Sequence, residues 1–377
     1  MIYDKAPFPW FGGKRDAAPS VWAALGDVDH YVEPFMGSLA VLIQRPHLAN
    51  RTYHTETVND LDGLLVNAWR AIRSAPDAVA EAASWPVSEV DLMARHLALV
   101  RWKDECLGRM RADPDFCDPK MAGWWVWGQS CWIGGDWCSG TGPWTVSPLG
   151  GVVKQSSKTR ADREPGVSSR LIHMPCDRGI LRQQAREPGV QSQLPYLSGD
   201  GKGINRSQAR DPGVGDFHPM TMPEIRRWLD YLSARLRHVR IAQGSWERLV
   251  TSAALQTLEV RNDGVCGIFL DPPYGDVRAA NVYASDSLTV AGDVQKWCIE
   301  NGGNPRYRVV LAGFDTEHVV LQSHGWRVVE WFRGGFLKGG MANIGSAGTN
   351  QHRERLWLSP HCLGADERQA SLFGGTP

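Results

Sequence analysis

The chain has 377 residues, and its 41 lysines and arginines balance 41 aspartates and glutamates, so its formal net charge is zero. This balance argues against a protein that holds nucleic acid by bulk charge, although it leaves room for a local basic surface. No apolar run reaches the ~18 residues that a membrane span requires, and no signal-peptide pattern stands at the start, so a cytosolic protein without membrane contact is expected. The length allows a full α/β domain and a second, smaller one.

Cysteine and tryptophan are the two notable residue types, with eight and seventeen copies. The cysteines are irregularly spaced and form no CxxC pair, so reduced, structural thiols are predicted rather than a metal site. Five tryptophans fall in the stretch "WWVWGQSCWIGGDW", residues 124–137. Their density favours an aromatic core and leaves a second interpretation open, an aromatic wall beside a base or ligand.

The first 75 residues alternate strand-like and helix-like segments, in chain order residues 30–35, 38–45, 52–58 and 61–74. A helical pattern follows over residues 88–111, and then the composition changes. Residues 139–220 are rich in Gly, Ser, Pro, Gln and Arg, and residues 151–220 carry eleven Lys or Arg against seven Asp or Glu.

A short phrase recurs within this segment, as "REPGV" at Arg163 and Arg186 and as "RDPGV" at Arg210. Proline followed by glycine is strong turn chemistry, so each copy predicts a turn with an arginine at its entrance. One interpretation is a passive insertion with decayed repeats. The other is a set of arginine-bearing loops that contact DNA phosphates or bases.

Regular structure resumes at Thr221, where a Thr…Glu capping box and an early proline predict a helix. Strand-like stretches then alternate with helical ones, at residues 239–243, 265–270, 308–313 and 326–331. This order predicts an α/β sheet that is interrupted by an insertion, with both ends of the chain contributing strands.

The stretch "GIFLDPPYGD" holds the strongest catalytic signal. A buried strand over residues 265–270 runs into Asp271, and Pro272 and Pro273 remove backbone freedom directly after it. Asp271 and Tyr274 are therefore presented rigidly at the carboxyl end of a strand, where ligands bind in open α/β sheets. A carboxylate and a carbonyl can accept from one NH₂ group while an aromatic ring stacks on the base. This pattern predicts methylation of the exocyclic amine of a flipped adenine or cytosine.

Two earlier strand ends suit a nucleoside-bearing cofactor. In "VEPFMGS" an acid, Glu33, can meet a cationic amine, and Gly37 lets the backbone approach a ligand closely. In "TVNDLDG" Asp60 is placed to bind the two hydroxyls of a ribose, although it could also cap the helix that follows.

Four motifs in this order resemble the Dam-type adenine-specific DNA methyltransferases of the alpha group: "PFPWFGGKR", "YVEPFMGSLAV", "VNDLDGLLVNAWRAI" and "FLDPPYGD". The resemblance implies S-adenosylmethionine as the methyl donor. It places Trp10, Gly12, Gly13 and Lys14 against the methionine part, although "GGK" could also be a plain loop with a solvated lysine. It implies that the cofactor loop consists of Glu33, Pro34, Phe35 and Gly37, and that Asp60 binds the ribose. It also implies that the target adenine is bound by Asp271, Pro272, Pro273 and Tyr274.

Two departures from the family pattern concern recognition. Such enzymes often carry an Asp-Phe pair where this chain has "GSW", residues 244–246, so the residue that reads the adenine amine of the cofactor stays open. They also often carry an asparagine in the aromatic segment, where this chain offers Gln129.

The resemblance implies a Rossmann-like methyltransferase sheet with an inserted target-recognition domain. We expect residues 1–87 to form the cofactor-binding part, 88–220 the recognition region, 221–360 the catalytic part and 361–377 a flexible tail. DNA is the expected partner, in a bacterial cell or phage-infected host, and the protein is expected to act as a monomer or weak dimer. The alternatives are methylation of cytosine N4 and a DNA-binding protein that keeps the fold without turnover.

Overall fold

The computed structural model describes residues 3, 5–10, 12–46, 54–132, 137–138, 144–146, 152–154, 221–259, 264–273, 287–331 and 353–364. The chain divides into two compact units. The helical unit comprises residues 1–11 and 63–237, and the sheet unit comprises residues 12–62 and 238–377.

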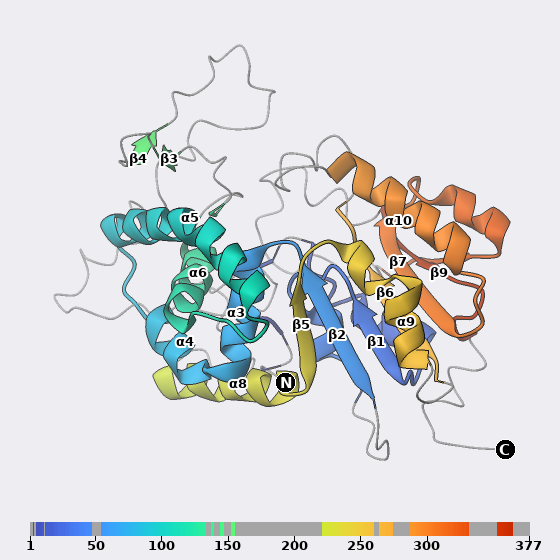
Figure 1. Ribbon diagram of the computed structural model, residues 1–377, viewed down its shortest axis with the longest axis horizontal. Coiled ribbons are helices and arrows are strands. Elements are labelled where there is room, and N and C mark those ends of the chain that lie inside the picture. Colours follow the sequence, from blue (N-terminus) through green and yellow to red (C-terminus); the bar gives the residue numbers. More distant parts are fainter. Residues whose placement is uncertain are drawn as a thin grey trace, which may run out of the picture. The chain divides into compact units, whose positions relative to one another are not determined.

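The sheet unit is built on a seven-stranded sheet with the order β5-β2-β1-β6-β7-β9-β8 (Figure 1). The strands β1, β2, β5, β6 and β7 run parallel to one another, whereas β9 is antiparallel to both β7 and β8. The strand bounds are β1 (His30–Glu33), β2 (Thr55–Asp60), β5 (Val239–Gln243), β6 (Cys266–Leu270), β7 (Tyr307–Phe314), β8 (Arg327–Val329) and β9 (Glu354–Leu358).

Both faces of the central strands are covered, and every residue of β1 and β6 is buried. On one face Val32 and Ile268 join a core with side chains of the helices α9 (Ser252–Glu259) and α10 (Ser287–Asn301). On the other face the ring of Tyr31 lies 4.8 Å from that of Trp22 in α1 (Ala18–Leu25). This double burial explains why β6 is a short continuous apolar run. The unit also contains α2 (Ala40–Ile43) and two 3₁₀ helices, η4 (Trp246–Leu249) and η5 (Val319–His324).

The sheet confirms the predicted α/β fold of the Rossmann-like methyltransferase type. The chain adds β2 and β5 on one side of β1 and then returns to place β6 on its other side. The carboxyl ends of β1 and β6 therefore flank a topological switch point, where ligands bind in open α/β sheets. The two ends of the chain also share the sheet, as the order of the predicted strands indicates.

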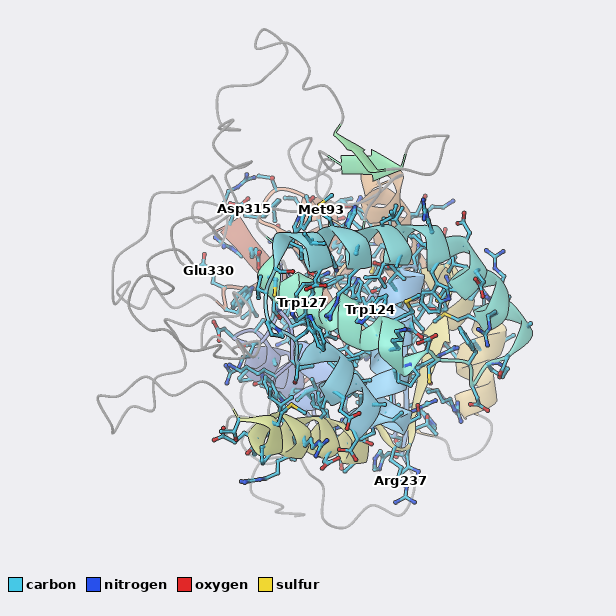
Figure 2. All side chains as sticks on the ribbon, turned by 90° about the vertical axis from the view of Figure 1, so that its left-hand side faces the viewer. Met93, Trp124, Trp127, Arg237, Asp315 and Glu330 are labelled. Carbon is cyan, nitrogen blue, oxygen red and sulfur yellow. The ribbon has the colours of Figure 1, made fainter. Side chains whose placement is uncertain are left out.

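The helical unit contains five described helices, α3 (Gly63–Ser74), α4 (Pro76–Ala83), α5 (Glu89–Ala112), α6 (Pro119–Cys131) and α8 (Met222–Leu236). The capping box predicted for the last of these is present, with Glu224 accepting from the backbone N–H of Thr221 at 2.6 Å. Trp125 and Trp127 are buried, as the core interpretation predicts, and Figure 2 shows Trp124 and Trp127 on α6. A two-stranded antiparallel pair, β3 (Trp144–Val146) and β4 (Val152–Lys154), was not predicted.

The unit boundaries differ from the sequence-based domain boundaries. The helices α3, α4 and α8 group with α5 and α6 in the helical unit, because the apolar faces of α3 and α8 pack within that unit. The functional division of the chain stays a prediction. Several predicted site residues, Tyr274, Arg163, Arg186 and Arg210, lie outside the described residues. Within the described part of the chain, no helix is both long and apolar enough to cross a membrane.

Candidate active site at the carboxyl ends of the parallel strands

Strand β1 ends with a buried acid. Glu33 is 2 % exposed, and its Oε2 accepts from the hydroxyl of Tyr31 at 3.0 Å. Burial raises the pKa of Glu33 well above its usual range, and the negative charges of Asp271 and Glu56 raise it further. The hydrogen bonds that this carboxylate accepts from the hydroxyl of Tyr31 and the backbone N–H of Leu42 act against this shift. A cation placed beside Glu33 would favour its charged form.

The loop after β1 makes a tight turn that is held from the next strand. Gly37 has a φ of 42°, in the left-handed region, and its N–H donates to Asp60 Oδ2 at 3.2 Å. The N–H of Met36 donates to the carbonyl of Asn59 at 2.8 Å. Leu39 also has a positive φ, 54°, and this residue precedes α2, which is only four residues long. The turn therefore depends on backbone contacts with the end of β2.

Asp60 ends β2 with both carboxylate oxygens occupied by backbone donors. Oδ2 accepts from Gly37, and Oδ1 accepts from the N–H of Asp62 at 3.0 Å. Burial raises the pKa of Asp60 to about 6, and these hydrogen bonds oppose the shift. Both donors, Gly37 and Asp62, precede the first residue of α3, Gly63. Asp60 therefore connects the loops at the ends of β1 and β2 and also lies three residues before a helix.

The end of β5 is tied to the same loops through Asn59. This side chain is 1 % exposed and donates to the carbonyls of Pro34 at 3.1 Å and Gly244 at 2.9 Å. Next to Gly244, the ring of Trp246 stacks on Phe35 with centroids 5.9 Å apart and planes at 29°. The "GSW" departure thus contributes an indole that packs on the loop after β1.

The Asp-Pro-Pro corner follows β6, and its acid is paired with a lysine from the N-terminal loop. Asp271 Oδ2 lies 3.1 Å from the Nζ of Lys14, which is only 4 % exposed. Lys14 also donates to the carbonyl of Gly12 at 2.7 Å. Pro272 is buried and Pro273 half-buried. The corner and the "GGK" loop therefore form one charged centre, and Lys14 is not a solvated side chain.

A second carboxylate approaches the same lysine. Glu354 Oε2 lies 3.8 Å from Lys14 Nζ, and this side chain is 13 % exposed. Burial raises the pKa of Glu354, the charge of Lys14 lowers it, and that of Asp271 raises it. Asp271 and Glu354 thus share one ammonium group, and the charge of Asp271 raises the pKa of both Glu33 and Glu354.

The sheet unit brings most of the predicted site residues to one edge, namely Gly12, Gly13, Lys14, Glu33, Pro34, Phe35, Gly37, Asp60, Asp271, Pro272 and Pro273. Trp10 belongs to the helical unit, where its ring packs against those of Phe8 and Trp125. Sequence reasoning missed Glu354, the bridging role of Asn59 and the ring of Trp246. The motif "HRERLWLSP" contains Glu354, but nothing in its letters indicates which cation it meets.

Comparison with known proteins supports the chemistry that this edge suggests. Residues 10–89 match the family model described as D12 class N6 adenine-specific DNA methyltransferase. The match spans the "GGK" loop, the Glu33 loop and Asp60. No curated protein matches the sequence. Over these residues the chain is therefore similar to the D12 class, and this match confirms the predicted resemblance to the Dam-type adenine-specific DNA methyltransferases.

Proposed function

We propose that the protein moves the methyl group of S-adenosylmethionine to the N6 amine of an adenine flipped out of duplex DNA. The observation that carries this proposal is the ion pair of 3.1 Å between Lys14 and Asp271 at the switch point of the sheet. A flipped base is required because N6 is paired inside the duplex and out of reach of a side chain at a strand end.

The residues at the strand ends fit the proposed cofactor. Asp60 offers a carboxylate oriented by two backbone donors at the end of β2, the position at which an acid binds ribose hydroxyls. The turn at Gly37 allows the backbone to approach a ligand closely. Glu33 is a buried acid that a cationic amine would stabilise in its charged form. When bound, S-adenosylmethionine supplies an electrophilic methyl group on a sulfonium centre.

The Asp271 corner fits the proposed target amine. Asp271 accepts a hydrogen bond from one N6–H, and the carbonyl of Pro272 accepts from the other, so the nitrogen lone pair becomes more available for attack. Lys14 favours the ionised form of Asp271, which is the form that accepts. Tyr274 stacks on the flipped base in this proposal. Arg163, Arg186 and Arg210 are proposed to contact the surrounding DNA.

The test is a methylation assay with S-adenosylmethionine that carries an isotopically labelled methyl group. We expect label in N6-methyladenine, and sequencing of DNA from expressing cells with modified bases located individually should reveal one preferred context. Label in N4-methylcytosine, or no transfer from this donor, would contradict the proposal. Asp271→Asn is the matched control for chemistry, since it keeps the shape of the side chain and removes its charge.

Base flipping has a separate readout. A duplex with 2-aminopurine at the target position should fluoresce more strongly when the protein binds, because the flipped base loses its stacking partners. Unchanged fluorescence on a duplex that the protein demonstrably binds would remove the flipping step.

A further inference from the structure

Glu354 reaches the site because of the direction of its strand. β9 runs antiparallel to β7, and Glu354, the first residue of β9, pairs with Phe314, the last residue of β7. The start of an antiparallel strand therefore lies at the same edge as the carboxyl ends of its parallel neighbours. This placement brings Glu354 to within 3.8 Å of a lysine 340 positions earlier in the chain.

The Lys14 ammonium is shared between two carboxylates. Its Nζ lies 3.1 Å from Asp271 and 3.8 Å from Glu354, and it donates to the carbonyl of Gly12 at 2.7 Å. An ammonium has three N–H donors and can therefore interact with more than one acceptor at a time. Because its distance is shorter, Asp271 is the primary partner of the ammonium, and Glu354 is the secondary one.

The other charges on these elements are directed elsewhere or add to the acidity. Glu33 approaches Asp271 from β1 and has a raised pKa. The two arginines beside Glu354 pair with other acids, Arg353 with Asp315 at 3.3 Å and Arg355 with Glu330 at 2.9 Å. Asp271 itself is paired with Lys14, at 3.1 Å.

We propose that Glu354 is a positioning residue for methyl transfer, which shares the Lys14 ammonium and takes it up when Asp271 turns to the target amine. An amine that approaches Asp271 competes with Lys14 for the same carboxylate. Withdrawing a buried ammonium from its partner is costly, and a second carboxylate already in place lowers that cost. This inference rests on the proposed function, in which Asp271 binds the amine.

The experiment measures the single-turnover rate of methyl transfer against pH in four variants of the full chain. Glu354→Gln should slow transfer about tenfold, with cofactor and DNA affinities within about twofold of wild type. The acidic limb of its pH–rate profile, where the rate falls as the pH is lowered, should move to lower pH by about one unit. The reason is that a negative charge near Asp271 is removed. Glu354→Asp keeps the charge and should recover much of the rate and the original limb.

The matched control is Glu330→Gln, which removes the exposed glutamate labelled in Figure 2. This glutamate pairs with Arg355 at 2.9 Å. The control variant should leave both rate and pH profile as in wild type. Asp271→Asn is the fourth variant and should abolish transfer if the proposed function holds. Thermal unfolding of each variant shows whether the fold is intact.

The outcomes separate the two proposals. Substantial turnover by Asp271→Asn would remove the proposed function. Loss of transfer in that variant, together with a Glu354→Gln profile like that of Glu330→Gln, would overturn the role of Glu354 alone. Equal losses in Glu354→Gln and Glu354→Asp with an unshifted acidic limb would also overturn it, since that result indicates a purely structural contribution.

Discussion

Two buried cations occupy contrasting surroundings, one in each unit. Lys14, 4 % exposed in the sheet unit, has carboxylate oxygens at 3.1 and 3.8 Å. Arg95, 8 % exposed in the helical unit, lies over three indoles, with its guanidinium 4.3 Å from the ring of Trp127, 5.4 Å from that of Trp85 and 5.5 Å from that of Trp124. Its hydrogen bond to the carbonyl of Ala82 is long, 3.5 Å.

The two surroundings indicate two different roles. Lys14 acts on the charge of neighbouring carboxylates, whereas Arg95 mainly contributes packing. The carboxylates of Asp271 and Glu354 fix the position of the Lys14 ammonium, and its charge lowers the pKa of Glu354. Indole faces attract a cation without neutralising it, and they pack along its stem and plane. Arg95 joins the end of α4 to α5 and α6, so its expected contribution is to stability. Lys14 is expected to contribute to chemistry.

The largest effect on methyl transfer should come from replacing Asp271, the acid that pairs with Lys14. Asp271→Ala should lower the methyl-transfer rate by about a thousandfold or more, because the target amine loses its charged acceptor. Cofactor affinity should stay near that of wild type, since Asp60 and Glu33 are unchanged. Rapid-quench kinetics and calorimetry measure the two quantities, and a variant that turns over at a rate close to wild type would contradict the catalytic role.

Removing the cation itself should have the next largest effect. Lys14→Met leaves Asp271, Glu354 and Glu33 facing one another without an ammonium, so the pKa of Asp271 should rise. We expect about a hundredfold slower transfer at neutral pH and an acidic limb displaced upward by about one unit, with partial recovery at higher pH. A rate loss that is independent of pH would show that Lys14 acts by contact with a ligand instead.

The sequence predicts the parts of this centre that local pattern determines. The apolar run before Asp271 predicts β6, the prolines after it predict the rigid corner, and the capping box at Thr221 predicts the start of α8. Each of these features depends on neighbours within a few residues.

The remaining features depend on topology. The Lys14–Asp271 pair joins positions that are far apart in the chain, and only the strand order brings them together. Glu354 reaches the charged centre because β9 lies between β7 and β8 and runs antiparallel to both. Trp246 and Phe35 stack because Asn59 ties their two loops together. None of these contacts leaves a periodic signal in the sequence.

Asp60 differs from Asp271 in the contacts of its carboxylate, which are backbone N–H groups rather than an ammonium. The pKa of Asp60 is raised from 3.8 to about 6, chiefly by burial, so its proton is retained further up the pH scale than in the unfolded chain. This protonated form favours folding, and the benefit is lost as pH rises through about 6. Ribose hydroxyls donate to the charged form, so cofactor binding should be strongest above that pH.

The pH dependence of cofactor binding tests this role of Asp60. The dissociation constant for S-adenosylmethionine should rise about tenfold for each pH unit below about 6 and stay flat above it. Asp60→Asn should bind about ten to a hundred times more weakly at pH ~8 and show no such dependence. Calorimetry across the pH range tests both, and a wild-type constant that does not change with pH would indicate that Asp60 does not bind the ribose.

The smallest effect on catalysis is expected at Arg95, where packing should matter more than charge. Arg95→Ala removes a side chain that is buried against three indoles, and we expect it to lower the free energy of unfolding by about 2 to 3 kcal/mol. Arg95→Met fills much of the same space without charge. Burial lowers the pKa of Arg95, which shows that this position disfavours a charge, so methionine should recover most of the lost stability. Both variants should keep the acidic limb of methyl transfer where wild type has it, in contrast to Lys14→Met. Chemical denaturation measures the stabilities, and a methionine variant as unstable as the alanine one would show that the cation–π attraction, rather than packing, holds the helices together.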